Sequence, residues 1–518
     1  MISTRIIYST NNIPGFSSLS SLVGDLLPYR QRPFSPVQHN LSTFSIPVLF
    51  YYSYYILHAK FRLTKHPLKH ILLSYIGRSF SLSGVNRSIH PVGVKMKFIV
   101  DFHVHSKYSR ATSKDMDVEN MARWANLKGV SLLGTGDWTH PFYFTELKQK
   151  LQPLGNGLFT LKKEYKKSVG NGQPNEIHFM LTTEVSNMFQ QGGGSRRIHT
   201  MIFAPSFEIV EKINEELRQF GKLGSDGRPI FGFPAKELVE IITDVSDECF
   251  IVPAHAWTPW FSVFGANSGF DSIQECFEEQ SKHISCIETG LSSDPKMNWR
   301  WSKLDKIALI SNSDAHSPNR IGREANVFDC ELSFKEIVKA IKTKDKSKFL
   351  STIEFFPEEG KYHYDGHRSC DILFSPAESR KNKSICPVCG RKLTIGVMNR
   401  VECLADRPDG FVPPGAIPYK NMIPLIEIIA EALNLGTETK GVENEYMRLV
   451  ATYGSEFRIL LDLPLEELEK NTPPKILEGI KRVREGDLKI IPGYDGVYGK
   501  IQIFGEKEKA ETKQLGLF

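Results

Sequence analysis

The sequence predicts an α/β protein built on a (β/α) barrel, followed by a small zinc-binding module and a mainly helical C-terminal region. Three observations support this fold class. From residue 98 onward, short apolar runs alternate with amphipathic helical patterns. Polar residues follow those runs, which is typical of a barrel whose active site lies at the carboxyl ends of its strands. A segment dense in Gly, His, Cys and Arg then precedes apolar residues at helical spacing.

A length of 518 residues exceeds what one compact domain usually needs, so several parts are expected. We expect an extension over 1–95, the barrel over 96–350, the zinc-binding module over 351–406, the helical region over 407–504 and a flexible tail over 505–518.

The first 95 residues account for the positive net charge. That charge is +6, but residues 1–95 hold ten Lys/Arg and a single acid, Asp25, which leaves 55 basic and 58 acidic residues elsewhere. Overall charge is therefore weak evidence for a nucleic-acid partner, and a binding surface would be a local patch. The most apolar run, 45–57, is too short to cross a bilayer, and no signal-peptide pattern is present. We interpret 1–95 as an upstream start assignment or a dispensable extension, with a DNA-touching basic arm as the alternative.

Each expected strand of the barrel leads toward a residue that can bind a cation. The first expected helix carries an apolar stripe over 118–125 and ends at Gly129. The runs and their polar followers are 98–102 with His103, 130–133 with Asp137, 177–181 with Glu184, Ile198 beside His199, 250–252 with His255, and 307–310 with Asp314 and His316.

These polar residues predict a metal centre, because imidazoles and carboxylates hold zinc and hard divalent cations, and a cluster of ions needs about eight such groups. Any single one could be an ordinary structural histidine or a surface carboxylate. Eight that follow successive apolar runs favour metal binding. The expected ligands are His103, His105, Asp137, Glu184, His199, His255, Asp314 and His316.

Within this set we expect Glu184 to bridge two ions and to be catalytic together with Asp314 and Asp137. His103, His105 and Asp314 would surround one ion, His199 and His255 another, and Asp137 and His316 would complete the set. A bound water made acidic by such ions attacks phosphorus directly, so no protein nucleophile is required.

The motifs that carry these residues resemble those of the polymerase-and-histidinol-phosphatase (PHP) superfamily. They are Asp101-Phe-His-Val-His105, Gly134-Thr-Gly-Asp137 and Ser313-Asp-Ala-His316. The resemblance covers 96–350 and implies a distorted (β/α)7-type PHP barrel, phosphoester hydrolysis, and two or three divalent ions, which would be Mg, Mn or Zn.

The chain departs from the superfamily pattern at two places. Many relatives have Thr-Asp-His where this chain has Thr135-Gly136-Asp137, so Asp137 would replace a histidine ligand, with His140 as a less favoured candidate. A histidine often found after the first motif is absent from 106–112, which leaves the occupancy of a third metal site open.

A second metal site is indicated by His367-Arg-Ser-Cys370 and, fifteen residues later, Cys386-Pro-Val-Cys389-Gly390. This spacing is typical of a structural zinc site, because a glycine after the second cysteine lets backbone amides point toward the thiolates. A coincidental pair of surface cysteines is the alternative. For the fourth ligand we expect His367, with Cys403 and His363 as competitors. The other cysteines show no paired spacing, so a reducing compartment is favoured.

The stretch from Glu354 to His367, with the cysteines and the helical region after it, resembles the endonuclease Q family over most of 96–504. That resemblance implies a DNA repair endonuclease that cuts 5′ to uracil, hypoxanthine, xanthine or an abasic site. Uracil and hypoxanthine present the same acceptor–donor edge, which a pocket could read once the nucleotide is flipped out.

Several residues are candidates for touching DNA. Trp138, Trp257, Trp260 and Tyr362 are candidates for stacking or wedging, although core packing is the competing role for each aromatic side chain. The expected DNA-binding residues are Arg196, Arg197, Arg320, Arg323, Lys361 and Tyr362.

The last five residues, Gln514-Leu-Gly-Leu-Phe518, resemble the bacterial sliding-clamp binding peptide, with Gln514, Leu515, Leu517 and Phe518 as its anchors. An uncomplicated solvated tail is the alternative. The peptide points to a bacterial host, and the expected location is cytoplasmic and nucleoid-associated, with damaged DNA and the clamp as partners and no membrane.

Two rival functions share these ligands. A small-molecule phosphoesterase of the PHP superfamily would act on a phosphate monoester and would need neither the cysteine module nor the tail. A non-catalytic binder of damaged DNA would use its metals structurally.

Overall fold

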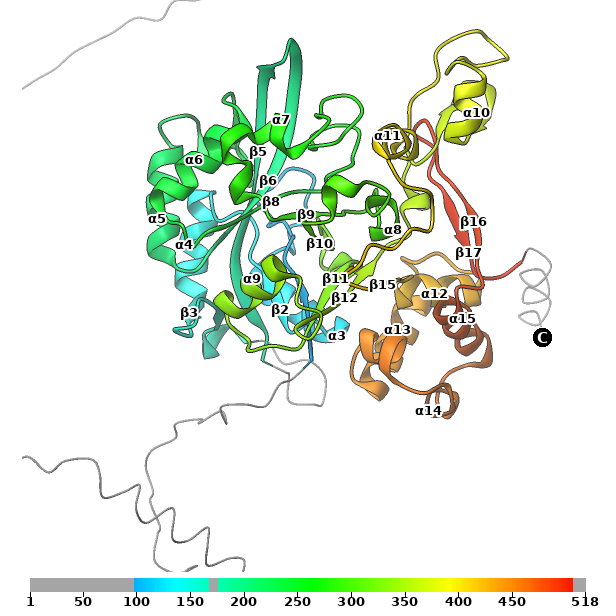
Figure 1. Cartoon of the computed structure of the whole chain (residues 1–518). Coiled ribbons are helices and arrows are strands. Elements are labelled where there is room, and N and C mark those ends of the chain that lie inside the picture. Colours follow the sequence, from blue (N-terminus) through cyan, green and yellow to red (C-terminus); the bar gives the residue numbers. More distant parts are fainter. Residues whose placement is uncertain (1–96, 167–175, 506–518) are drawn as a thin grey trace, which may run out of the picture. The chain divides into compact units, whose positions relative to one another are not determined.

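The computed structural model of the chain describes residues 97–166 and 176–505 (Figure 1). The expected extension over 1–95 and the clamp peptide at the end of the chain lie outside these residues. Within the described ranges, no helix combines the length and the apolar character needed to span a bilayer.

The barrel is formed by seven strands that surround one site. β5 pairs in parallel with β2, but β6 runs antiparallel to both β5 and β8. The barrel is therefore distorted relative to one in which all strands are parallel. A bond from the Ala256 amide to the Glu288 carbonyl links β8 to β9, and a bridge between Val104 and Ala315 closes the ring. The expected distorted seven-stranded barrel is confirmed. Its strands are β1 (Phe98–Asp101), β2 (Leu132–Gly134), β5 (His178–Gln191), β6 (Gly194–Ala204), β8 (Phe250–Pro253), β9 (Cys286–Glu288) and β10 (Ala308–Ile310).

Further strands extend the sheet beyond the barrel. β11 (Ala325–Phe328) runs antiparallel to β1, β12 (Phe349–Glu354) runs antiparallel to β11, and β15 (Tyr419–Asn421) joins β12 in parallel. The expected boundary at residue 350 therefore lies inside β12. The remaining strands of this sheet are β3 (Leu151–Pro153), β4 (Phe159–Leu161) and β7 (Ile230–Phe231).

The first helix shows why the sequence pattern was informative. The side chain of Asp117 accepts a bond from the Asn120 amide and starts the helix, while Gly129 ends it with a φ of 89°. The expected apolar stripe is buried between these caps. The helices around the barrel are α3 (Val118–Lys128), α4 (Pro141–Lys150), α5 (Phe207–Leu217), α6 (Ala235–Val245), α7 (Ile273–Phe277), α8 (Pro295–Asn298) and α9 (Phe334–Thr343).

The residues after the barrel form the cysteine-bearing segment and a helical region, drawn in yellow and orange in Figure 1. The former contains β13 (Asp365–His367), β14 (Ile372–Phe374), α10 (Pro376–Lys381) and α11 (Val397–Leu404). The latter contains α12 (Leu425–Leu433), α13 (Lys440–Tyr453), α14 (Leu465–Glu469) and α15 (Pro474–Glu485), followed by the hairpin of β16 (Lys489–Ile491) and β17 (Lys500–Gln502).

Candidate metal centre and zinc site

Six of the eight expected ligands form two adjoining groups inside the barrel mouth. His103, His105 and Asp314 make one group, and Glu184, His199 and His255 the other, with the ligand atoms of each within 4.8 Å of one another. Glu184 lies between the groups: its Oε1 is 2.9 Å from His199 Nδ1, and its Oε2 is 3.5 Å from His105 Nε2. This division is the one expected from the sequence, while metal ligation itself stays a prediction.

The donor atoms of the first group fit a cation. Nε2 of His103, Nε2 of His105 and Oδ1 of Asp314 are buried and form no hydrogen bond, and the last two atoms lie 3.0 Å apart as an ion pair. Buried polar atoms normally have hydrogen-bond partners. The opposite nitrogens of both rings are held by carboxylates: Nδ1 of His103 lies 3.0 Å from Glu288, and Nδ1 of His105 lies 3.0 Å from Asp137. A carboxylate behind the imidazole is the usual support of a metal-bound histidine.

The electrostatics keep the central carboxylates ionised. Burial alone would raise the pKa of Glu184, but the charges of His199 and Arg228 outweigh it and hold that pKa well below the usual range. Burial likewise opposes ionisation of Asp314, yet His103 and His105 lower its pKa. Burial opposes protonation of His105, but Asp137 raises the pKa of this ring to about 9. Metal binding would therefore displace a proton from His105.

Three strand-end residues have left-handed backbone conformations. The φ angles are 47° at Asp137, 30° at His255 and 46° at Asp314. Side-chain-bearing residues adopt this region at an energetic cost, and such conformations cluster at functional sites. Each of the three turns directly follows a buried strand, which explains why short apolar runs marked the site.

Glu184 and His199 are positioned in another way. They lie inside the long β5–β6 hairpin, where Ser186 pairs with His199 and Glu184 pairs with Met201. The expectation that every candidate ligand ends a strand is wrong for these two residues, because β5 continues from His178 to Gln191 without a break.

Asp137 occupies a place different from the expected one. It belongs to neither group: Oδ1 faces His105, while Oδ2 accepts bonds from the Ser106 amide, the Ser106 hydroxyl and the Ser109 hydroxyl at 2.6–2.9 Å. Both oxygens are thus engaged by the protein. The geometry is that of a carboxylate that orients a ligand, and we treat its role as a proposal.

His316 and His140 also lie outside both groups. His316 Nδ1 donates to the Asp314 carbonyl at 2.9 Å, and its ring lies 4.5 Å from the His105 ring, so the residue borders the site. The His140 ring stacks on that of Tyr108, with ring centroids 4.5 Å apart.

Two charged residues beside the ligands were missed. Glu288 is fully buried, accepts from the His255 amide at 2.8 Å and the Asn312 amide group at 2.8 Å, and supports His103. The sequence did contain a signal for Glu288, because this residue directly follows the mostly apolar stretch 284–287. Arg228, whose Nη1 lies 2.9 Å from Glu184 Oε2, follows no apolar run and carried no such signal.

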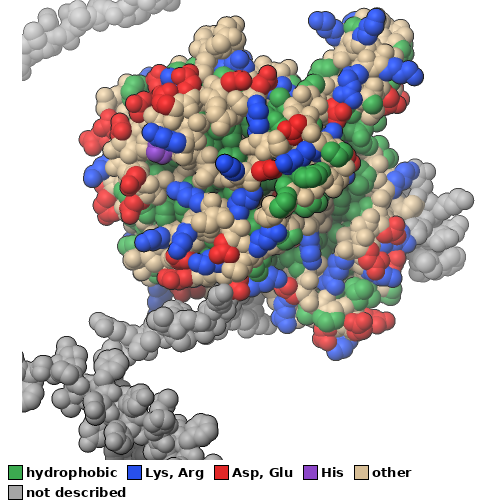
Figure 2. Space-filling model, viewed as in Figure 1, with side chains coloured by type: hydrophobic (Ala, Val, Ile, Leu, Met, Phe, Trp, Pro, Cys, Tyr) green, Lys and Arg blue, Asp and Glu red, His purple; other side chains and the backbone are tan. Residues whose placement is uncertain are grey.

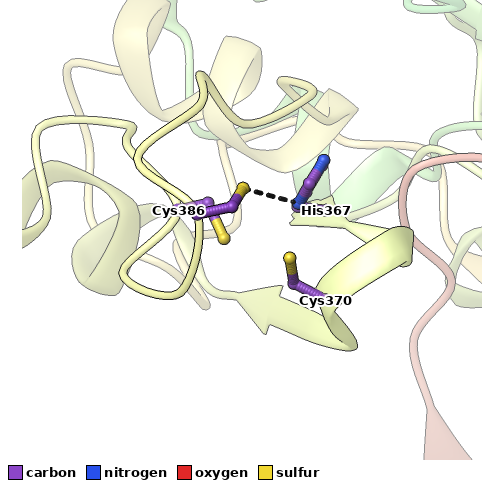
Figure 3. A group of neighbouring side chains, drawn as sticks. His367, Cys370 and Cys386 are labelled. Atoms are coloured by element: carbon purple, nitrogen blue, oxygen red, sulfur yellow. Dashed lines mark hydrogen bonds between the residues drawn. The ribbon is translucent and has the colours of Figure 1, made fainter.

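The cysteine segment brings its expected ligands together. The ligand atoms of His367, Cys370, Cys386 and Cys389 lie within 4.8 Å of one another. Figure 3 shows His367, Cys370 and Cys386 turned toward one another. Gly390 has a φ of 71°, and its amide bonds the Cys386 carbonyl, which closes the knuckle turn. Cys403 bonds Asn399 and His363 stays outside the group, so neither competitor is placed as the fourth ligand.

The candidate DNA-contacting residues have separate partners in the structure. Arg196 bonds the Gly269 carbonyl and stacks on Phe270, Arg197 lies over Phe261, and Arg320 pairs with Glu427 at 2.8 Å. Arg323 donates to the Ser313 carbonyl, one residue before Asp314. Lys361 lies over the Tyr498 ring.

The four aromatic candidates divide into two kinds. Trp138 and Trp257 are at most 1% exposed and belong to the core, where Trp257 donates to Asn298. Trp260 is 40% exposed, and its ring lies 5.4 Å from that of Tyr362. Figure 2 shows basic and acidic side chains interspersed over the face in view, so no single basic field dominates there.

The sequence is similar to one family model and to proteins from Methanocaldococcus jannaschii and Bacillus subtilis. A family model described as the MJ0043 C-terminal domain matches residues 424–487. The uncharacterized protein MJ0043 of Methanocaldococcus jannaschii is 34% identical over 271 residues, which are 51% of this chain and 33% of that protein. The chain thus spans about a third of that relative's length. The uncharacterized protein YqxK of Bacillus subtilis is 26% identical over 419 residues, 78% of this chain and 99% of that protein.

Two solved structures are similar along most of the chain. The lesion-specific endonuclease PfuEndoQ from Pyrococcus furiosus has a TM-score of 0.69 and 33% identity, covering 82% of this chain and 99% of its own. A crystal structure of Endonuclease Q with a 27-mer duplex substrate, which carries an abasic lesion at the active site, has a TM-score of 0.68 and 33% identity, covering 80% and 98%.

Proposed function

The chain belongs to the endonuclease Q family and is a metal-dependent DNA repair endonuclease; on this premise we propose that it hydrolyses the phosphodiester 5′ to deaminated bases and abasic sites. The proposal rests on the two ligand groups, which Glu184 joins. It is supported by the similarity of the chain to the lesion-specific endonuclease PfuEndoQ. Uracil, hypoxanthine, xanthine and abasic nucleotides are the proposed substrates.

Each residue of the centre has a proposed task. His103, His105 and Asp314 would hold one divalent ion, His199 and His255 another, and Glu184 would face both. Divalent ions at such a site activate water for in-line attack and neutralise the phosphate charge. Asp137 and Glu288 would fix the rings of His105 and His103 by accepting from their Nδ1 atoms. We propose that the centre holds two or three divalent ions, which would be Mg, Mn or Zn.

The substrate range is tested with one duplex series that carries uracil, hypoxanthine, an abasic site or a normal nucleotide at the same position. We expect a single cut 5′ to each lesion and none in the normal duplex. Turnover of a sugar phosphate with no cut in any duplex would instead favour the small-molecule phosphoesterase.

The catalytic part is tested with Glu184→Ala and Asp314→Asn. Removal of one central carboxylate should abolish nicking and leave measurable affinity for the lesion duplex in the presence of a chelator, because neither carboxylate is among the proposed DNA-contacting side chains. An unchanged nicking rate would refute the assignment of these residues, and a wild-type protein that binds lesions without cutting them would support the non-catalytic binder.

We place part of the DNA surface beside His255. The imidazole of His255 lies 3.1 Å from the Thr258 hydroxyl, which donates to the Trp260 carbonyl, so the exposed Trp260 is tied to the centre by a short chain of bonds. Tyr362 packs against Trp260, and Lys361 is its neighbour in sequence. Exposed aromatic rings beside a cation suit base stacking and phosphate contact. Arg196, Arg197, Arg320 and Arg323 are the further proposed contacts.

The C-terminal peptide is proposed to bind a bacterial sliding clamp. Gln514, Leu515, Leu517 and Phe518 would fill a groove of the clamp, and the charged segment before them would act as a linker. Deletion of 514–518 should abolish capture by an immobilised clamp and leave basal nicking unchanged. Retention of clamp binding would refute the peptide's role.

We also propose that the enzyme works in the cytoplasm, at the nucleoid of a bacterium. The eight cysteines all lie in the part of the chain that the structure describes and form no disulfide there, as is usual in a reducing compartment. Four of them lie in the hydrophobic core.

A further inference from the structure

The loop after α5 places an arginine against the centre. The guanidinium of Arg228 donates from Nη1 to Oε2 of Glu184 at 2.9 Å, and its side chain is 24% exposed. The carboxylate it touches is fully buried and faces both ligand groups. Arg228 is thus at the mouth of the centre, with a cationic group partly open to solvent.

The remaining donors of this guanidinium are free in the described part of the chain. An arginine has five N–H groups in a planar fork. Apart from the bond to Glu184, no side-chain bond of Arg228 is present in residues 97–166 and 176–505, and none of its nitrogens is buried without a partner. The open edge of the fork therefore faces solvent beside the site.

The backbone around Arg228 is held on several sides. The Gly227 amide donates to the Tyr108 carbonyl, the Gly227 carbonyl accepts from Thr139, and the Pro229 carbonyl accepts from the Ser186 amide. A Cβ at Gly227 would lie 2.4 Å from both Asp137 Oδ2 and Ser109 Oγ, so only glycine allows the loop this approach. The loop is built to bring Arg228 close to the ligand cluster.

The charge of Arg228 is secure in this position. Burial works against the charged form, but the carboxylates of Glu184 and Asp314 raise the pKa of the guanidinium. Arg196 and Arg197 instead lie over the rings of Phe270 and Phe261, and among the arginines of the described residues only Arg228 pairs with Glu184.

We propose that Arg228 is a catalytic residue of this centre: one N–H fixes Glu184, and the open edge of the fork binds the phosphate whose ester bond is cut. A planar fork matches two phosphate oxygens, and a fixed cation stabilises the charge that develops in the transition state. Arg228 supplies this positive charge directly beside the ligand cluster. This inference rests on the proposed phosphodiester hydrolysis.

The test compares Arg228→Met and Arg228→Lys with Arg218→Met, which makes the same change at the exposed end of α5. At saturating Mn²⁺, Arg228→Met should lower the single-turnover rate of lesion cleavage by roughly 100-fold, as is usual when one transition-state donor is removed. Arg228→Lys should recover part of the rate and Arg218→Met all of it.

A second readout separates catalysis from support of Glu184. Titration with Mn²⁺ measures the support of Glu184: Arg228→Met should bind Mn²⁺ about 10–100-fold more weakly than the wild type, and its cleavage rate should stay low once Mn²⁺ saturates the protein. Full recovery of the Arg228→Met rate by excess Mn²⁺, or an unchanged rate at saturation, would overturn the proposal.

Hydrolysis of bis(p-nitrophenyl) phosphate, a diester without a DNA lesion, tests the role of Arg228 separately from the proposed substrate. A wild-type protein that hydrolyses this diester but cuts no lesion duplex refutes the proposed substrate, whereas a loss with Arg228→Met on the same diester still supports the role of Arg228. No loss on either substrate would refute that role alone.

Discussion

Asp137 was expected to bind a metal ion, and the structure places its carboxylate behind another expected ligand, His105. The motif pointed to a metal ligand, but its carboxylate faces Nδ1 of His105, and its second oxygen is occupied by Ser106 and Ser109. Glu288 has the same relation to His103. The two histidines of the H-x-H motif thus each have a carboxylate behind the ring, an arrangement that fixes which nitrogen is left for a metal.

Asp137→Asn distinguishes support from ligation. If Asp137 orients His105, the number of bound ions should be unchanged and the affinity for Mn²⁺ should fall by about 10–100-fold. Metal content by elemental analysis and affinity by calorimetric titration measure the two quantities. Asp115→Asn, which makes the same change at an exposed position, serves as the control. Loss of one ion per chain at saturating metal would show that Asp137 is itself a ligand.

The contact between α3 and the helical region depends on a buried ion pair. Lys128, at the end of α3, lies 2.7 Å from Glu456, and both side chains are at most 4% exposed. Tyr446 and the Leu425 amide also donate to Glu456, so this carboxylate joins α3, α12 and α13. Gly129 packs against Ser455 at the same place.

Lys128→Met should lower the free energy of unfolding by about 3–5 kcal/mol, because Glu456 would keep a buried charge without its cation. Urea denaturation provides the measurement. Lys97→Met removes the exposed pair with Asp462 and should cost at most about 1 kcal/mol.

The double variant Lys128→Met/Glu456→Gln should regain part of the loss, since it removes the uncompensated charge. Equal costs for the buried and the exposed pair would contradict this account of the contact.

For the whole molecule, a buried acid pair links overall stability to pH. Glu354, at the end of β12, accepts from Thr289 at 2.9 Å and Ser311 at 3.1 Å, and Glu324 is buried beside it. Burial raises the pKa of Glu354 to about 8 and raises that of Glu324 well above its usual range.

Stability should fall as the pH rises, because the folded protein holds the proton of Glu354 more tightly than the unfolded chain does. Because the pKa of Glu354 in the folded chain lies above its usual value, this group contributes full stability below about pH 4.5 and loses it as the pH rises through about 8. Wild-type protein should therefore lose on the order of 1–3 kcal/mol of unfolding free energy between pH 5.5 and 8.5 that Glu354→Gln does not lose.

Urea denaturation at these two pH values, with the exposed Glu279→Gln as control, measures the difference. Parallel pH dependences in wild type and Glu354→Gln would show that Glu354 is ionised in the folded protein throughout.

The sequence by itself determined the features that lie within a short stretch of chain. The strand-end turns of His103, His255 and Asp314, the caps of α3 and the Cys386–Gly390 knuckle are local, because the apolar run, the turn residue and the ligand are neighbours in sequence. Residue type and spacing were therefore enough to select six residues that the fold assembles into two groups.

Only the tertiary structure decided the orientations and partners of those residues. Glu288 meets His103 across 185 residues, and Arg228 meets Glu184 across 44, separations at which no local pattern links the partners. The direction of the Asp137 carboxylate depended on donors from another turn, and the long β5–β6 hairpin placed Glu184 and His199 within strands. Local periodicity encodes which face of a strand or helix is buried, whereas the packing of separate elements decides which polar atoms meet.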